Sequence, residues 1–363
     1  MNGPLDRQEA FSGTKEVPAA LSFDREKLKS FLAREIPGFV GPLGIRQFKG
    51  GQSNPTYLVS TPERDYVLRR KPPGKLLPSA HAVDREYRVM SALGTAGFPV
   101  PKTFLLCEDE TVIGTAFYIM EKVDGRIVWE PSMPHVDPTE RLAIYRAMNE
   151  TLASLHRLEP DAIGLGDFGK PEGYVARQIA RWSKQYRASE TEKVDEMDRL
   201  IAWLPENLPP ENPARVVHGD FRLDNLILHA KEPRVLAVLD WELSTLGDPV
   251  ADFTYHCMQW EMPAMPDGSG IGSLEGLDLA ALGIPGLETY IGWYETATGF
   301  SVRDRLEFYF AYNFFRIAAI LQGIAGRVRD GTAANENAVA MIRQIRPLAR
   351  TAWRFARQAG ARG

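Results

Sequence analysis

The sequence predicts an α+β fold in which an antiparallel sheet is followed by a mainly helical part. Two observations lead to this prediction. Up to residue 122, short runs of strand-forming residues alternate with turn-forming ones, as in antiparallel sheets. Beyond that point, apolar residues recur at three- and four-residue intervals over long segments, which is typical of amphipathic helices. The chain has 363 residues, 44% of them hydrophobic, and this is enough for two lobes.

The N-terminal lobe is expected at residues 24–122, after an extension formed by residues 1–23. Its strands are predicted at residues 45–48, 56–59, 66–70, 103–107 and 115–122. One helix is predicted over residues 80–93, because its apolar residues are spaced three or four positions apart.

A glycine-rich turn is predicted between the first two strands, and it contains Gly50, Gly51, Ser53 and Asn54. Because the two glycines have no side chains, the backbone N–H groups of the turn can approach phosphate oxygens, and Ser53 can add a hydroxyl. The four residues are therefore candidates for phosphate binding. A Gly-Gly hairpin also occurs in many proteins without any ligand, so the turn alone is a weak signal.

The C-terminal lobe is expected at residues 123–363. Its helices are predicted at residues 139–158, 171–188, 195–204, 303–328 and 335–357, the last one kinked at Pro347. A further helix should start near Asp248, which can act as an N-cap before Pro249. Residues 261–287 are rich in Pro, Gly, Ser and Met and are predicted to form a lid or substrate loop.

Charge and cysteine content exclude several kinds of partner. The net charge of −4 gives no general footprint for nucleic acid or for an anionic membrane surface, so neither partner is expected. No apolar signal segment is found in residues 1–23. The two cysteines, Cys107 and Cys257, are expected to be core thiols, which fits a reducing compartment and a cytoplasmic location. The oligomeric state stays open.

Three polar residues lie around three strand-like runs, 214–217, 226–228 and 235–239. Asp220 follows the first run, Asn225 opens the second, and Asp240 closes the third. Phosphoryl transfer needs a carboxylate that orients the acceptor hydroxyl and oxygen ligands that hold magnesium. A reversal between the second and third strands would bring Asp240 back to Asn225. We therefore interpret Asp220 as a catalytic base and Asn225 and Asp240 as ligands of Mg²⁺.

The segments His218-Gly219-Asp220 and Asp240-Trp241-Glu242 resemble the motifs of the aminoglycoside phosphotransferase superfamily, which also includes choline and homoserine kinases. The resemblance implies a two-lobed, protein-kinase-like fold, with ATP and Mg²⁺ as cofactors and GTP as an alternative donor. It also implies a role for Arg222 at the γ-phosphate. The implied hinge contains Glu121 and Val123, whose backbone groups would bind the adenine edge.

In this resemblance an arginine replaces the phosphate-pairing lysine of kinases. Arg69 matches that position better than Arg70, which should point to the opposite face of an alternating strand. Glu86 is placed to pair with the arginine. The alternative is that Glu86 is a solvated partner of Arg85 or Arg88.

Residues 66–87 and the segment Arg222-Leu223-Asp224 are similar to the branch whose animal members are fused to acyl-CoA dehydrogenases. The branch implies phosphorylation of the hydroxyl of a hydroxy acid or a hydroxyacyl-CoA. Residues 255–295 contain six acids and no Lys or Arg, which favours a cationic acceptor and an aminoglycoside or amino-alcohol phosphotransferase. A nucleotide-binding pseudokinase is the third hypothesis. Asp220, Asn225 and Asp240 together argue against it.

Arg316 stands among apolar residues in the predicted helix 303–328. An arginine in such surroundings is expected to pair with a fixed anion. An internal ion pair with Asp248 or Asp252 is the favoured interpretation. The alternative is a clamp for a carboxylate of the substrate.

Overall fold

The computed structural model describes residues 12–49, 54–74, 81–265, 272–331 and 340–362. The chain forms two compact units. The sheet unit comprises residues 5–129 and 224–244, and the helical unit contains residues 130–223 and 245–363. Residues 224–244 thus belong to the same unit as the N-terminal residues. The predicted boundary, between residues 122 and 123, instead divides the chain once, in sequence order. The lobes 24–122 and 123–363 stay a prediction.

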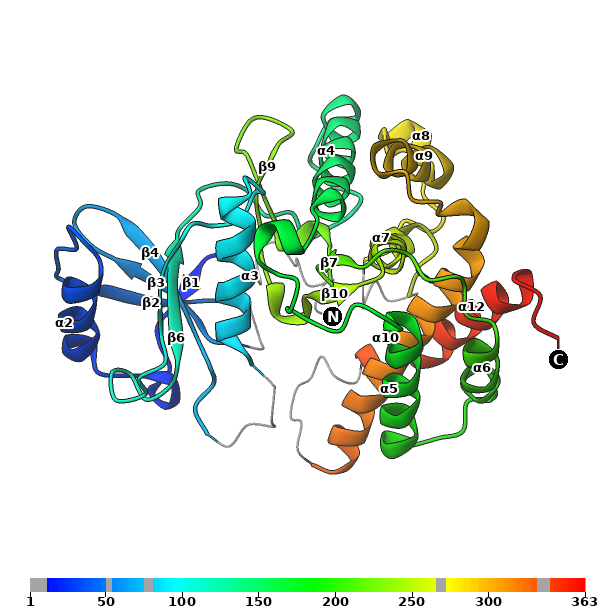
Figure 1. Ribbon diagram of the computed structural model, residues 1–363, viewed down its shortest axis with the longest axis horizontal. Coiled ribbons are helices and arrows are strands. Elements are labelled where there is room, and N and C mark those ends of the chain that lie inside the picture. Colours follow the sequence, from blue (N-terminus) through cyan, green and yellow to red (C-terminus); the bar gives the residue numbers. More distant parts are fainter. Residues whose placement is uncertain (1–11, 50–53, 75–80, 266–271, 332–339, 363) are drawn as a thin grey trace, which may run out of the picture. The chain divides into compact units, whose positions relative to one another are not determined.

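The sheet unit contains a six-stranded sheet in the order β1-β2-β3-β4-β6-β5, and every neighbouring pair is antiparallel (Figure 1). Its strands are β1 (Thr14–Lys15), β2 (Gly44–Phe48), β3 (Thr56–Ser60), β4 (Asp65–Arg70), β5 (Thr103–Cys107) and β6 (Phe117–Glu121). The predicted sheet is confirmed. The strands lie where apolar and polar residues alternate in the sequence, because one face of the sheet is buried in a core.

That core includes a helix that the sequence analysis did not predict, α2 (Arg25–Glu35). Leu28 and Leu32 of α2 are fully buried together with Tyr57, Val59 and Leu68 of the sheet. Asp24 is the N-cap of α2, where its carboxylate accepts hydrogen bonds from two backbone N–H groups. The helix therefore begins directly after Asp24, at Arg25.

The predicted helix at residues 80–93 is α3 (Val83–Thr95), and it packs against β5 and β6. A two-stranded hairpin, β8 (Leu226–Leu228) and β9 (Val235–Val238), completes the sheet unit. The segment after β9 also contacts α3. There the Trp241 ring packs edge-on against Phe98, with the ring centroids 5.9 Å apart.

The helical unit is built around α10 (Leu306–Arg329), which is buried over most of its length. It packs against α5, α7 and α12. Other helices of this unit, among the described residues, are α4 (Pro138–Arg157), α5 (Tyr174–Ser189), α6 (Asp195–Glu206), α7 (Pro249–Cys257), α8 (Leu279–Leu282), α9 (Leu287–Thr298) and α12 (Ile345–Gln358). Two short strands, β7 (Arg215–Val217) and β10 (Thr245–Gly247), pair antiparallel. The expected mainly helical part is confirmed.

The last helix differs from its prediction. Residues 343 and 344 form a turn and α12 begins at Ile345, so Pro347 lies in the first turn of a helix instead of causing a kink. Proline is tolerated there because the first N–H groups of a helix have no partner within the helix.

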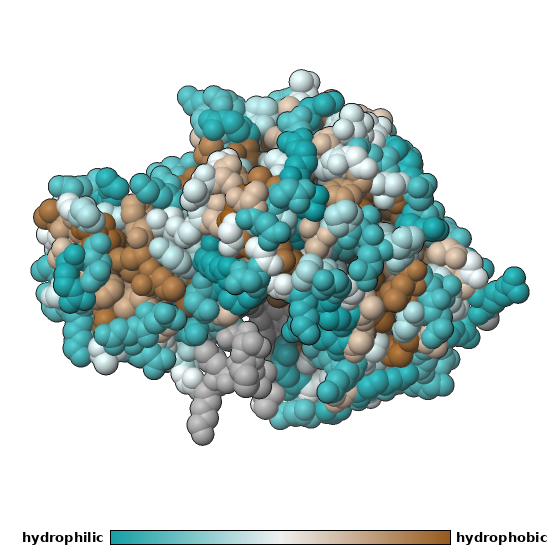
Figure 2. Space-filling model, viewed as in Figure 1, coloured by the Kyte–Doolittle hydropathy of each residue, from teal (hydrophilic) through white to brown (hydrophobic). Residues whose placement is uncertain are grey.

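Hydrophilic side chains cover most of the face that Figure 2 shows. Within the described part of the chain, no helix is both long and apolar enough to span a membrane. Both cysteines are free and buried, as predicted.

Candidate active site

A cavity of about 600 Å³ lies within the sheet unit. Apolar side chains from three elements line it, among them Val67 of β4, Met90 of α3 and Met120 of β6. Ile227 and Leu239 line it from the β8–β9 hairpin. Such walls suit a flat aromatic ring, because they bury apolar surface on both of its faces.

The predicted hinge residues Glu121 and Val123 also line this cavity. Glu121 is the last residue of β6, and its backbone N–H donates to the carbonyl of Lys102 at 2.8 Å. The next turn is held against the hairpin, because Arg126 and Leu228 exchange two backbone hydrogen bonds. Gly125 is required there, since a Cβ atom would lie 2.4 Å from the Leu228 carbonyl oxygen.

Arg69 lies on the cavity side of β4 between two carboxylates. Its Nε atom is 2.8 Å from Glu86 Oε2, and its Nη2 atom is 2.6 Å from Asp240 Oδ1. Burial alone would lower the pKa of Arg69, but Glu86 and Asp240 hold that pKa above its usual range. The guanidinium is therefore a fixed positive charge at the edge of the cavity.

The pairing of Glu86 with Arg69 was predicted, and the structure contains it. Glu86 is only 1% exposed, and burial raises its pKa while the charge of Arg69 opposes the rise. Its two carboxylate oxygens accept hydrogen bonds from Asn54 Nδ2 at 2.7 Å and from the Tyr118 hydroxyl at 3.0 Å. The interpretation of Glu86 as a solvated partner of its neighbours is wrong.

Arg70 points to the opposite face of β4, as the alternation of the strand predicted. It donates to the backbone carbonyls of Leu21 and Ile113 and packs over the rings of Phe23 and Tyr57. Of the two arginines, Arg69 is therefore the one that lines the cavity.

Of the four predicted turn residues, Gly50, Gly51 and Ser53 lie outside the described residues. Asn54 is described, and its side chain is fully buried. It is hydrogen-bonded to Glu86 and, through Oδ1, to His81 Nδ1 at 2.9 Å. Its side chain therefore supports the Glu86 carboxylate, and its contact with phosphate stays a prediction.

Asn225 and Asp240 are brought together by the β8–β9 hairpin. Leu226 pairs with Val238, and the Leu239 N–H donates to the Asn225 carbonyl at 2.8 Å. Asp240, the next residue, has a left-handed backbone with φ of 65°. A non-glycine residue in this conformation is strained, and such strain is common at functional sites.

The donor set at this place fits magnesium. Asn225 and Asp240 both line the cavity and offer an amide oxygen and a carboxylate. Among the described residues, no group of three or more His, Cys, Asp or Glu side chains could hold a metal ion. Mg²⁺ is usually held by one or two protein oxygens, with phosphate oxygens and water as the other ligands. A site of two protein ligands beside a nucleotide is therefore chemically suitable.

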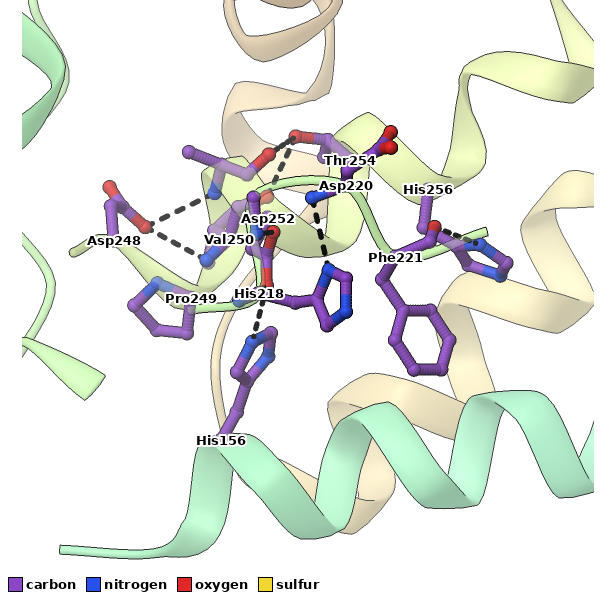
Figure 3. Close-up of polar contacts among 12 residues, drawn as sticks. His156, His218, Asp220, Phe221, Asp248, Pro249, Val250, Asp252, Thr254 and His256 are labelled. Carbon is purple, nitrogen blue, oxygen red and sulfur yellow. Dashed lines mark hydrogen bonds and ion pairs between the residues drawn. The ribbon is translucent and has the colours of Figure 1, made fainter. Parts of the chain in front are cut away.

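A separate group of candidate residues lies in the helical unit, in the loop that follows β7. The backbone N–H groups of His218 and Gly219 each donate to the carboxylate of Asp252 at 2.8 Å (Figure 3). His156 of α4 is hydrogen-bonded to the same carboxylate at 3.2 Å. His156 is therefore a hydrogen-bonded core histidine.

Two more residues of α7, Tyr255 and His256, also contact this loop. The Tyr255 hydroxyl donates to Asp220 Oδ1 at 2.7 Å. His256 is neutral, because burial lowers its pKa to about 4. Its Nε2 atom lies 2.7 Å from the Tyr290 hydroxyl and its Nδ1 atom 3.2 Å from the Phe221 carbonyl. One face of α7 thus holds the loop around Asp220.

Sequence reasoning missed Tyr255, His256 and the contact of Arg316. The spacing of residues 252, 255 and 256 places them on one helix face, and this was the available signal.

The predicted site residue Arg222 is half-buried, and its positive charge opposes the rise in the pKa of Tyr255.

The preferred interpretation of Arg316 was wrong. Arg316 donates from Nη2 to the Gly219 carbonyl at 2.9 Å, and among the described residues no carboxylate lies within ion-pair distance. Asp248 instead caps α7 and accepts from Tyr309 and Asn212, and Asp252 binds the loop. Arg316 therefore stabilises the loop directly.

Three of the acids of residues 255–295 form ion pairs, and one of the six, Asp267, lies outside the described residues. Arg354 lies 2.8 Å from Glu261, and Arg303 forms ion pairs with both Glu288 and Glu295. Asp278 caps α8. The charge argument for a cationic acceptor is therefore weaker, because three of the six charges have arginine partners, and the acidic lid stays a prediction.

Replacing Asp252 by asparagine is expected to lower the free energy of unfolding by about 2–4 kcal/mol at pH 7. Burial alone would raise the pKa of Asp252, but hydrogen bonds from His156 and from the loop hold that pKa below its usual range. A carboxylate with a lowered pKa stabilises the fold above its unfolded pKa of about 3.9, and this contribution is lost as the pH falls through the folded value.

Urea unfolding at several pH values measures the effect. The difference between Asp252→Asn and wild type should be largest above pH 4 or so and shrink below it. Asp195→Asn is the control, because Asp195 is exposed on α6 and forms a surface ion pair with Lys193. An equal loss in both variants would show that Asp252 has no special role.

Three comparisons place the chain among known proteins. The model of the phosphotransferase enzyme family matches residues 44–269. Acyl-CoA dehydrogenase family member 10 of Mus musculus is 45% identical over 353 residues, covering 96% of this chain and 33% of that protein. The chain spans between a third and a half of the length of the curated relatives that it matches.

Two solved structures share the fold. A Ralstonia eutropha protein provisionally called an aminoglycoside phosphotransferase is 50% identical, with a TM-score of 0.85, covering 93% of this chain and 99% of that chain. A mutant of aminoglycoside phosphotransferase APH(4)-Ia, in a ternary complex with AMP-PNP and hygromycin B, is 16% identical with a TM-score of 0.58 and covers 92% and 99%. The second likeness concerns the fold alone.

Proposed function

Because this chain belongs to the phosphotransferase enzyme family, we propose that it is an ATP- and magnesium-dependent kinase of a hydroxy acid or a hydroxyacyl-CoA. The observation that carries the proposal is Arg69, held between Glu86 and Asp240 at the edge of an apolar cavity. A fixed cation beside an apolar pocket suits a ligand that joins an aromatic base to phosphates.

In the proposed reaction the ATP base occupies the apolar part of the cavity, next to the backbone of Glu121 and Val123. Arg69 binds phosphate oxygens, and Asn225 and Asp240 would hold Mg²⁺, which supplies charge neutralisation for the phosphates. Gly50, Gly51 and Ser53 stay candidates for phosphate contacts. GTP is an alternative donor, because backbone groups of the hinge would contact the base, and the side chains do not reveal which base these groups select.

Asp220 is proposed to orient the acceptor hydroxyl and to take its proton. Arg222, two residues later, is proposed to contact the γ-phosphoryl group. Asp220 is suited to its role because Tyr255 fixes one of its oxygens and the side chains of Asp252, His256 and Arg316 hold its loop.

The acceptor class rests on the relatives. Curated relatives at 41–45% identity are named acyl-CoA dehydrogenase family members, and they are longer than this chain. A kinase joined to such a domain would act on a compound related to an acyl chain, hence a hydroxy acid or its CoA ester. The buried thiols Cys107 and Cys257 support a reducing compartment, and we place the enzyme in the cytoplasm.

The second candidate is an aminoglycoside or amino-alcohol phosphotransferase. The name of the Ralstonia eutropha relative favours it, whereas the pairing of Glu261, Glu288 and Glu295 with arginines weakens it.

Release of the nucleoside diphosphate by the purified protein, ADP from ATP or GDP from GTP, tests these proposals. The acceptors are 4-hydroxy acids, their CoA esters, choline, homoserine and kanamycin, each with and without Mg²⁺, with ATP or GTP as donor. Turnover with a hydroxy acid or CoA ester supports the first candidate, and turnover with kanamycin, choline or homoserine supports the second. Nucleotide binding without turnover on any acceptor would contradict both and favour a pseudokinase.

A further inference from the structure

Tyr255 is hydrogen-bonded to the side chain of Asp220. Its hydroxyl lies 2.7 Å from Asp220 Oδ1, and the tyrosine is buried on α7. This distance is typical of a strong hydrogen bond between a hydroxyl and a carboxylate. One of the two carboxylate oxygens of Asp220 therefore has a fixed protein partner.

The phenol of Tyr255 remains protonated throughout the neutral pH range. Burial raises its pKa, and the nearby negative charge of Asp220 raises it further. A phenol that keeps its proton can only donate to the carboxylate, so the direction of this hydrogen bond is fixed. Because a donated hydrogen bond favours the ionised form of an acid, it also keeps Asp220 ready to accept a proton.

Arg316 of α10 holds Tyr255 and the loop together. Its guanidinium carbon lies 5.0 Å from the centroid of the Tyr255 ring, and its Nη2 donates to the Gly219 carbonyl at 2.9 Å. Arg316 is only 6% exposed. A buried guanidinium stacked on an aromatic face stabilises that ring in place. The ring, the loop backbone and the Asp220 carboxylate thus form one connected group.

We propose that Tyr255 is a positioning residue that fixes the Asp220 carboxylate, so that Oδ2 takes the proton of the acceptor hydroxyl. Arg316 keeps Tyr255 in place. This inference rests on the proposed function. In the step, a bond forms between the acceptor oxygen and the γ-phosphorus, and the bond from that phosphorus to ADP breaks. The hydroxyl proton moves to Asp220 Oδ2, and Tyr255 keeps its own proton.

The substitution Tyr255→Phe tests the proposal, because it keeps the ring on Arg316 and removes only the hydroxyl. With the acceptor that wild type turns over best, kcat should fall by ~10- to 100-fold and the KM for ATP should stay unchanged. The acidic limb of the pH profile of kcat should move about one pH unit higher, because the ionised Asp220 carboxylate loses the hydrogen bond that Tyr255 donates. A purely structural role would leave this limb in place.

Tyr309→Phe is the matched control. Tyr309 is a buried tyrosine of the same unit, and its hydroxyl donates to Asp248 Oδ2 at 2.6 Å. This variant should lose stability but keep the wild-type pH profile. An equal shift of the acidic limb in Tyr255→Phe and Tyr309→Phe would overturn the proposal, because the cause would then be a general loss of packing in the helical unit.

A second readout does not depend on turnover. The carboxyl ¹³C signal of Asp220, identified by its absence in Asp220→Asn, should titrate at higher pH in Tyr255→Phe than in wild type. With 3-fluorotyrosine at position 255, a stronger donor of unchanged shape, it should titrate at lower pH. The fluorinated protein decides the question if Tyr255→Phe does not fold.

If Asp220 titrates at the same pH in wild type, in Tyr255→Phe and in the fluorinated protein, the proposed role of Tyr255 is overturned. Absence of turnover by wild type on every acceptor would instead overturn the proposed function, with the titration still reporting on Tyr255. The two failures are therefore distinguishable.

Discussion

Replacing Asp220 by asparagine is expected to lower kcat by ~10²- to 10⁴-fold, the usual contribution of a general base. The amide has nearly the shape of the carboxylate, and its oxygen can still accept from the Tyr255 hydroxyl. It cannot take a proton from the acceptor, so the loss should appear in turnover. Nucleotide binding should be unchanged, because Asp220 lies outside the unit that contains the cavity.

The measurement combines steady-state ADP release with a thermal shift by ATP and Mg²⁺. Asp304→Asn is the control, since Asp304 is an exposed aspartate of the same unit. Full activity of Asp220→Asn would remove Asp220 from the proposed mechanism. Loss of the nucleotide shift in this variant would mean that the substitution disturbs more than the base.

Replacing Asp240 by alanine is expected to abolish the part of nucleotide stabilisation that depends on magnesium. A ligand at 100 times its Kd stabilises the folded state by about 2.7 kcal/mol, so a large fall in affinity is readily seen in the melting temperature. The protein itself should remain folded, because Arg69 keeps its ion pair with Glu86.

Thermal melts with ATP, with Mg²⁺ and with both provide the test. Glu242→Gln is the matched control, because Glu242 also approaches Arg69, at 3.7 Å, and is not proposed to bind metal. If Asp240→Ala gains as much from Mg²⁺ as wild type does, another residue holds the metal. If Glu242→Gln loses the gain instead, the metal ligand is Glu242.

Local patterns were sufficient to predict most of the fold. Strand alternation predicted the sheet and also the opposite directions of Arg69 and Arg70. It could not decide which arginine lines the cavity, because that depends on what packs against each face. Likewise, the reversal between β8 and β9 correctly predicted that Asn225 and Asp240 meet.

The contacts missed from the sequence join distant segments. Tyr255 lies 35 residues from Asp220, and Arg316 lies 97 residues from Gly219. No local periodicity encodes such pairs, since they follow from how α7 and α10 pack. The count of acids in residues 255–295 has the same weakness, because it does not include the arginines of other segments that pair with three of them.

The carboxylate of Asp252 also has a consequence for hydrogen exchange. Loops usually exchange their amide protons quickly, because their N–H groups face water. The amides of His218 and Gly219 are instead buried and bound to a carboxylate on α7. They can exchange only when α7 separates from the loop. Their protection should therefore equal that of α7 amides, so that loop and helix open as one cooperative unit.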